Sequence, residues 1–185
     1  LIIDELHTFF GTKRGDLLSL GLARLATLAP KAVRLGLSAT INEPESAREW
    51  FCRTGGRIVR TSNYTHPNIE ILCTEKTIPW SGHMARHALN DIYVAISEAR
   101  LSLVFVNTRA QAEFVFKELW HLNKLNLHIA VHHGSLDRQL RRKVEAHMAT
   151  GELDCVVATS SLDLGLDWAK VDLVIQVGAP KGVSR

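Results

Sequence analysis

Short apolar runs and amphipathic stripes alternate along this chain. Residues 1–4 form a short apolar run that ends in Asp4, which is typical of a strand covered on both faces of a sheet, and residues 33–37 predict another buried strand. Similar patterns predict further strands at 57–60, 69–73, 101–106, 127–131, 153–158 and 171–177. Between the strands, apolar residues at helical spacing predict helices at 17–29, 42–51, 84–99, 110–122 and 136–150. This alternation predicts an α/β fold in which parallel strands are flanked by helices on both faces.

Capping residues suggest where some of these helices begin. Asp16 can cap the first helix, which Pro30 closes, and the preceding loop runs from Gly11 to Gly15. Asn42 can cap the second helix. The polar segment 61–68 is the best linker candidate, because it contains Pro67 near its end. We therefore expect two similar α/β domains, residues 1–65 and 66–185.

Composition adds only broad limits to this picture. The 185 residues are 46% hydrophobic and 22% charged, which is typical of a soluble globular protein. With 22 basic and 19 acidic side chains, the net charge of +3 only weakly favours a polyanionic partner. The three cysteines form no CxxC pair, as expected of reduced thiols in the cytosol. No signal peptide or membrane span is predicted, and we expect a cytoplasmic protein.

Polar residues gather where the predicted strands end. Asp4, Glu5 and His7 follow the first strand, and Ser38 and Thr40 follow the second. Later strands end in the same way, at Asn107, Thr108 and Arg109, at His133, Gly134 and Ser135, and at Thr159, Ser160 and Ser161. Ligands of open α/β sheets bind outside the C-terminal ends of the strands. The sequence therefore predicts a ligand site along these ends.

The acidic pair Asp4 and Glu5 suits the chemistry of magnesium and phosphate. A hard cation prefers carboxylate oxygens, keeps several waters and takes its remaining ligands from phosphates. Asp4 would hold Mg²⁺ through a water, and Glu5 would orient and deprotonate an attacking water. The alternative is a strand that ends in acidic residues by chance, and the motif alone does not decide between the two.

Small polar residues at two strand ends predict phosphate contacts. Thr159 and Ser160 offer hydroxyl and backbone N–H groups at a strand-to-helix turn. Gly134 and Ser135 precede a helix whose N-terminus would attract a phosphate, although Ser135 could be only its N-cap. We attribute the basic residues on that helix to a solvated face; they are Arg138, Arg141, Arg142 and Lys143.

Two further pairs suit a nucleotide or a nucleic-acid backbone. Gly165 would let the chain approach a ligand closely, and Asp167 could accept hydrogen bonds from ribose hydroxyls. The alternative for both is an ordinary strand-to-helix turn. Lys13 and Arg14, in the predicted loop between two glycines, are placed to meet a phosphate backbone.

Taken in order, these motifs resemble the motor of a superfamily 2 helicase. Residues 4–7 (DELH) match the DExH form of the Walker B box, 38–40 (SAT) the SAT motif, and 158–167 the fifth motif. Residues 104–109 (VFVNTR) match the strand that opens the second motor domain's nucleic-acid contacts. Three segments resemble the large-helicase-related (Lhr) group: 11–15 (GTKRG), 132–136 (HHGSL) and 158–165 (ATSSLDLG). Three further segments resemble its bacterial subgroup, the ligase-associated DExH-box helicases: 79–83 (PWSGH), 86–87 (RH) and 178–182 (GAPKG).

The resemblance covers essentially the whole chain and implies two RecA-like domains of the P-loop NTPase type. It implies ATP and Mg²⁺ between the domains, and 3′-to-5′ movement on single-stranded or partly duplex DNA. It further implies a role in DNA repair beside ligase and nuclease proteins in the bacterial cytosol. No membrane partner is implied.

The resemblance also implies roles for individual residues. Asp4 and Glu5 act on Mg-ATP, with Asp4 as the Mg²⁺ ligand. The residues that couple hydrolysis to domain closure are His7, Ser38 and Thr40. Gly165 and Asp167 contact the nucleotide. Nucleic-acid phosphates meet Lys13, Arg14, Thr108, Arg109, Gly134, Ser135, Thr159 and Ser160.

Two motifs of the family are absent from the sequence. We expect the GxGKT phosphate loop to precede Leu1 and the QRxGR box with its arginine fingers to follow Arg185. Because phosphoryl transfer depends on both, we expect the 185 residues alone to hydrolyse ATP negligibly. The alternatives are a catalytically silent nucleic-acid-binding module and an RNA helicase, since phosphate contacts do not report the 2′-hydroxyl.

Overall fold

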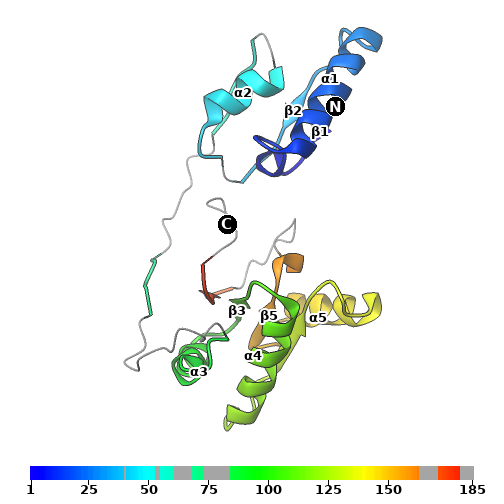
Figure 1. The fold of residues 1–185 in the computed structure, drawn as a ribbon. Coiled ribbons are helices and arrows are strands. Elements are labelled where there is room, and N and C mark those ends of the chain that lie inside the picture. The colour runs from blue at the N-terminus through cyan, green and yellow to red at the C-terminus, as the bar shows by residue number, and fades with distance from the viewer. Residues whose placement is uncertain (40, 53–54, 61–67, 73–83, 163–170, 180–185) are drawn as a thin grey trace. The chain divides into compact units, whose positions relative to one another are not determined.

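A computed structural model gives the fold of the chain (Figure 1). It describes residues 1–39, 41–52, 55–60, 68–72, 84–162 and 171–179. The chain divides into two compact units, Leu1–Ile69 and Glu70–Val183. The domain boundary expected at residue 65 lies outside the described residues. No helix in the described ranges is long and apolar enough to cross a membrane.

The first unit is built from short strands and two helices. Its elements are β1 (Ile2–Ile3), the 3-10 helix η1 (Leu6–Thr8), α1 (Lys13–Leu28), β2 (Leu35–Gly36) and α2 (Pro44–Cys52). Strands β1 and β2 pair in parallel, with Ile2 opposite Leu35 and Ile3 opposite Gly36.

One face of this small sheet is packed and the other is exposed. The core of the first unit joins Leu6, Leu22 of α1 and Phe51 of α2. Ile3 packs against this core, so its neighbour Ile2 points to the opposite face and is 64% exposed. The expectation that both runs are covered on both faces is therefore wrong for the described residues. Both helices contribute to the same core.

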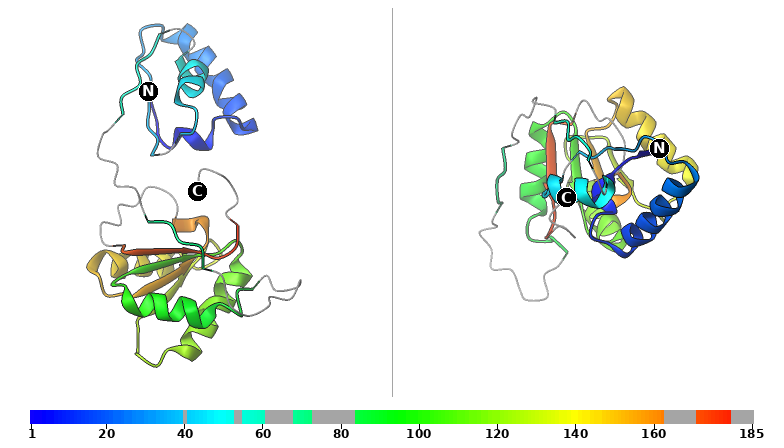
Figure 2. Two further views of the ribbon diagram at one scale, coloured as in Figure 1. Left: turned by 90° about the vertical axis from the view of Figure 1, so that its left-hand side faces the viewer. Right: turned by 90° about the horizontal axis from the view of Figure 1, so that it is seen from above.

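The second unit is a parallel sheet between helices. Its elements are α3 (Leu89–Glu98), β3 (Ser102–Phe105), α4 (Arg109–Leu122), β4 (Ile129–His132), α5 (Arg138–Thr150), β5 (Cys155–Ala158), the 3-10 helix η2 (Ser160–Leu162) and β6 (Leu173–Gln176). The strand order is β4-β5-β3-β6, and all three pairings are parallel. The two views of Figure 2 show this sheet with its helices around it. The predicted α/β class is confirmed.

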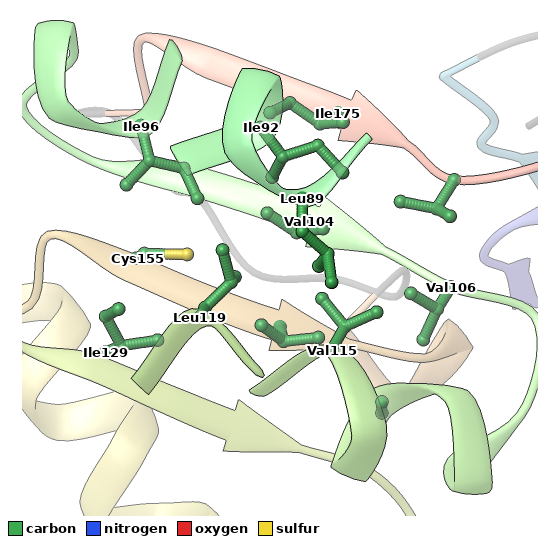
Figure 3. Packing of buried hydrophobic residues seen from close by; sticks show 13 residues of the cluster. Leu89, Ile92, Ile96, Val104, Val106, Val115, Leu119, Ile129, Cys155 and Ile175 are labelled. Atoms are coloured by element: carbon green, nitrogen blue, oxygen red, sulfur yellow. The ribbon is translucent and has the colours of Figure 1, made fainter. Parts of the chain in front are cut away.

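Apolar side chains cover both faces of the second sheet. On one face, α3 and α4 pack onto the sheet through residues such as Ile96, Leu119 and Val104 (Figure 3). On the other face, Met148 of α5 packs against Leu103 and other strand residues. The predicted core face of α3 is confirmed, since Leu89, Ile92 and Ile96 are all buried.

Two helices of the chain begin elsewhere than expected. Helix α1 begins at Lys13, because the hydroxyl oxygen of Thr12 accepts the Gly15 N–H at 3.2 Å and caps the helix. Asp16 is therefore in the first turn and is not the cap, and Lys13 and Arg14 are helical and not in a loop. Helix α2 begins at Pro44, so its N-cap position is Glu43 and Asn42 lies one residue before that position.

The start of α5 also differs from the prediction. Asp137 is the N-cap, since its Oδ1 accepts the Gln139 N–H at 2.7 Å. Ser135 is therefore not the cap, and Leu136 lies outside the helix. Gly151 ends α5 in the left-handed conformation (φ 75°), a position where glycine is favoured.

Two predicted strands and one helical turn are absent from the parts of the chain that the structure describes. Residues 57–60 and 69–72 form no strand, and Val59, Ile69 and Ile71 are 78, 82 and 88% exposed. An apolar run becomes a strand only where a neighbouring strand completes its hydrogen bonds, and these runs have none in the described ranges. Residues 84–88 precede α3 as turns, so that helix begins later than expected.

Candidate nucleotide and nucleic-acid sites

The acidic box lies in a sharp turn after β1. Glu5 adopts a left-handed backbone conformation (φ 51°, ψ 47°), which is uncommon for a residue other than glycine. The Glu5 N–H donates to Asp4 Oδ1 at 2.9 Å, and the Leu6 N–H donates to the carbonyl of Leu37 at 2.9 Å. The box is thus anchored to the end of β2, while the Asp4 side chain is exposed.

His7 joins the acidic box to the segment after β2. Its Nδ1 lies 2.9 Å from Ser38 Oγ and 3.4 Å from Glu5 Oε2. The ring is partly buried, with 20% of its side chain exposed. Four of the sequence-predicted residues therefore lie together: Asp4, Glu5, His7 and Ser38. Thr40 lies outside the described residues.

The donor atoms at the acidic box suit magnesium. Within the described ranges, no three His, Cys, Asp or Glu side chains are grouped to hold a metal ion. A cation beside Asp4 would therefore keep waters and take oxygen ligands from phosphate. This is the coordination that Mg²⁺ prefers, whereas a structural zinc site needs four protein ligands.

Lys13 and Arg14 form the exposed first turn of α1. The Arg14 guanidinium lies 5.6 Å above the centre of the Phe9 ring. Both basic groups sit where a helix presents free N–H groups, which favours an anion. Lys13 and Arg14 therefore remain candidates for a phosphate contact, although they lie in a helix and not in a loop.

Three strand ends of the second sheet are level with one another. Phe105 of β3 and His132 of β4 are both opposite Ala158 of β5. The residues that follow these ends form what we call the strand-end surface: Thr108, Arg109, Gly134, Ser135, Thr159 and Ser160. The structure thus brings together the residues predicted from three separate motifs in this unit.

Side chains link two parts of the strand-end surface directly. Arg109 is the first residue of α4, and its Nη1 donates to Ser135 Oγ at 2.9 Å. Thr108 caps the same helix, since its hydroxyl oxygen accepts the Gln111 N–H at 3.2 Å. The Thr108 hydroxyl hydrogen remains able to donate to a phosphate. The segments after β3 and β4 are therefore held together before any ligand binds.

Two buried histidines, His132 and His133, connect the strand-end surface to neighbouring elements through side-chain contacts. The His132 ring lies with Nδ1 2.8 Å from Ser161 Oγ and Nε2 3.1 Å from Glu145 Oε1. The neighbouring His133 has Nε2 2.7 Å from Glu113 Oε1 on α4. Burial lowers the pKa of the His132 ring, and the adjacent Glu145 carboxylate opposes this effect.

The backbone of His132 also holds the turn after β5. Its carbonyl oxygen accepts the Thr159 N–H and the Ser161 hydroxyl, each at 3.2 Å. Ser161 is thus engaged inside the protein, whereas Ser160 is exposed. The sequence did not predict that His132 and His133 hold this surface in place. The two adjacent histidines at the start of HHGSL (132–136) were the signal that could have indicated it.

Asn107 is a second residue whose role the sequence did not indicate. Its Nδ2 donates to the carbonyl of Ala179 at 2.9 Å, which ties the end of β3 to the segment after β6. Gly178 has φ 78° in that segment, a conformation that favours glycine. Gly165 and Asp167, predicted to contact the nucleotide, lie outside the described residues.

Comparisons with known proteins show what the chain is similar to. Residues 84–185 match the family described as "Helicase conserved C-terminal domain". The chain is 36% identical to "ATP-dependent helicase Lhr-Core protein 2" of Thermococcus barophilus, over 100% of this chain and 23% of that protein. It is 32% identical to "Lhr helicase/uracil glycosylase" of Escherichia coli, over 100% of this chain and 15% of that protein.

A solved structure extends the similarity to three dimensions. The Mycobacterium smegmatis helicase Lhr, bound to single-stranded DNA and AMP-PNP, matches with a TM-score of 0.74 and 33% identity. The match covers 99% of this chain and 25% of that one. The chain therefore spans a quarter or less of the length of these relatives.

Proposed function

This chain belongs to the Lhr-type helicases of the helicase conserved C-terminal domain family, and from that premise we propose that it carries part of an ATP-driven motor. The full-length protein would couple ATP hydrolysis to movement on single-stranded DNA. The observation that carries the proposal is the contact between His7 and Ser38, at 2.9 Å. It joins the acidic box to the SAT segment, which is the arrangement needed for hydrolysis and motion to affect each other.

The acidic box supplies the groups for hydrolysis. Glu5 would orient the attacking water and take its proton, and its left-handed backbone presents the carboxylate beside His7. Asp4 would hold Mg²⁺ through a water. When bound, Mg²⁺ would neutralise charge on the phosphates. Ser38 would respond to movement of His7. Thr40 stays a predicted coupling residue, and Gly165 and Asp167 stay predicted nucleotide contacts.

The strand-end surface supplies the contacts to nucleic acid. Arg109 offers a fixed positive charge whose direction is set by its hydrogen bond to Ser135. Thr108, Ser160 and the N–H groups near Gly134 would donate to phosphate oxygens. Lys13 and Arg14 would offer phosphate contacts on the first unit. Contacts of this kind fix position and carry no base sequence.

The preference for DNA is part of the proposal. Its support is the solved relative that holds single-stranded DNA. A repair role accords with the E. coli relative, whose name joins a helicase to a uracil glycosylase. The ligase-associated subgroup, ligase and nuclease partners and a bacterial cytosolic location rest on the resemblance alone. An RNA helicase is the alternative, and comparing stimulation of the ATPase by single-stranded DNA and RNA distinguishes the two.

Substituting Glu5 by glutamine tests the proposed mechanism. In the full-length protein, Glu5→Gln should lower the nucleic-acid-stimulated ATPase rate by about 100-fold or more, because the amide cannot take a proton. Binding of a non-hydrolysable ATP analogue should change by less than about twofold, since Asp4 is unaltered. Steady-state ATPase and fluorescence titration measure the two quantities.

Glu49→Gln is the matched control, since Glu49 is an exposed carboxylate on α2 of the same unit. It should leave the ATPase rate unchanged. Full turnover by Glu5→Gln would remove Glu5 from the mechanism. Oligonucleotide binding without any turnover by the wild-type protein would instead favour the silent binding module.

A further inference from the structure

An added side chain at Gly15 would collide with the backbone of a neighbouring segment. A Cβ at position 15 would lie 2.0 Å from the carbonyl oxygen of Phe9 and 3.2 Å from Cζ2 of Trp50. Gly21, in the same helix, has no heavy atom within 4 Å of the corresponding position. The contrast shows that position 15 excludes a side chain for steric reasons that do not apply elsewhere in α1.

The partner of Gly15 belongs to the segment that continues from the acidic box. The Thr8 N–H donates to the carbonyl of Glu5 at 2.9 Å, and the Phe9 N–H donates to the carbonyl of Leu6 at 3.1 Å. These bonds close η1 and its C-cap directly after Glu5. Phe9 is therefore linked to the proposed general base by successive hydrogen bonds rather than by a flexible loop.

The same carbonyl of Phe9 receives the start of α1. It accepts the Thr12 N–H at 3.1 Å and the Thr12 hydroxyl at 2.7 Å. The Thr12 oxygen in turn accepts the Gly15 N–H at 3.2 Å. Lys13 and Arg14 lie between Thr12 and Gly15. The turn that carries both basic groups is therefore hydrogen-bonded to the Phe9 carbonyl through Thr12 and lies against the same carbonyl at Gly15.

We propose that Gly15 is a positioning residue that couples the nucleic-acid contact of Lys13 and Arg14 to the acidic box. The first turn of α1, Phe9 and η1 move as one body, because Gly15 allows direct contact between helix and carbonyl. A phosphate that draws Lys13 and Arg14 toward it therefore shifts Glu5. This inference rests on the proposed function, and it adds the path by which nucleic acid stimulates hydrolysis.

The acidic box has a separate anchor that predicts how a variant behaves. Leu6 N–H donates to the Leu37 carbonyl at 2.9 Å, and His7 contacts Ser38. A methyl group at position 15 would push the start of α1 away from Phe9 while these bonds to the β2 end persist. Basal hydrolysis is then kept and its stimulation is lost.

ATPase rates of the full-length protein, with and without saturating single-stranded DNA, test the coupling. Gly15→Ala should lower the stimulation factor by about fivefold or more, a typical size for coupling between sites. Its basal rate and its affinity for a non-hydrolysable ATP analogue should stay within about twofold of wild type. Gly21→Ala, the matched control, should match wild type in all three measurements.

A double variant tests whether Gly15 acts through the basic pair. Lys13→Ala with Arg14→Ala should already lower the stimulation factor. Adding Gly15→Ala should then cause little further loss, because residues acting on one path are not additive. Independent, multiplicative losses would overturn the proposed path.

Thr12 variants keep the test decisive if Gly15→Ala does not fold. Thr12→Val removes both hydroxyl bonds without adding bulk beside Phe9, and it should lower the stimulation factor. Thr12→Ser should restore it. Unchanged stimulation in Gly15→Ala and Thr12→Val, or equal loss of basal and stimulated rates, would overturn the inference. A wild-type protein without stimulation would instead contradict the proposed function.

Discussion

His132 shows how one side chain can organise a surface that it does not reach. It is 1% exposed, yet its ring and its carbonyl together contact Ser161, Glu145 and the Thr159 N–H. The exposed Ser160 therefore stands on a turn that is held from the end of β4. We conclude that the strand-end surface is ordered before it meets a ligand, which lowers the entropy lost on binding.

The lowered pKa of His132 predicts a specific dependence of stability on pH. Burial favours the neutral ring, so the unfolded chain takes up a proton first as the pH falls through about 6.5. The folded state therefore loses stability over that range, down to the lowered pKa of the folded protein. The melting temperature of the wild-type chain should exceed that of His132→Asn by less and less as the pH falls below about 6.5. Thermal unfolding over a range of pH measures this difference. A constant or increasing difference in melting temperature would contradict a lowered pKa for the buried His132 ring.

At the scale of elements, the fold of the second unit could be predicted from sequence because its helical stripes and its apolar strand runs both indicate the same sheet between helices. Leu89, Ile92 and Ile96 follow a helical period and are buried in one core, and the continuously apolar run that becomes β5 is buried on both faces of the sheet. The starts of α1 and α5 could not, since Thr12 and Asp137 compete with Asp16 and Ser135 as caps of similar propensity. Local sequence names the candidates for a cap, and only tertiary contacts, such as that between Gly15 and Phe9, select one.

The reassigned start of α5 predicts the effect of removing its cap. Asp137→Ala should lower the free energy of unfolding by about 1 kcal/mol, because the Gln139 N–H loses its acceptor. Asp137→Asn keeps a capping oxygen and should cost a few tenths of that, roughly 0.3 kcal/mol. Urea unfolding of the chain measures both. Equal losses in the two variants would indicate that charge, and not the cap, is what Asp137 contributes.

At the scale of the whole molecule, each unit carries one group of the predicted site residues. The first unit carries the acidic box with His7 and Ser38, and the second carries the strand-end surface with its buried histidine supports. The motif order predicted both groups of residues, whose roles stay predictions. The level ends of β3, β4 and β5 explain why motifs that are distant in the sequence lie close together in the second unit. The histidine supports and the Gly15 contact could not be predicted, because each depends on which backbone atoms come close in three dimensions.

The salt dependence of single-stranded DNA binding tests most directly whether the strand-end surface meets phosphates. Arg109→Ala in the full-length protein should weaken binding and reduce the slope of log K against log salt concentration by about 0.7, the value for one phosphate contact on a single strand. Arg142→Ala, an exposed arginine on α5, should leave the slope unchanged. We expect this difference in slope between the two variants. An unchanged slope in Arg109→Ala, or a wild-type protein that does not bind single-stranded DNA, would contradict it.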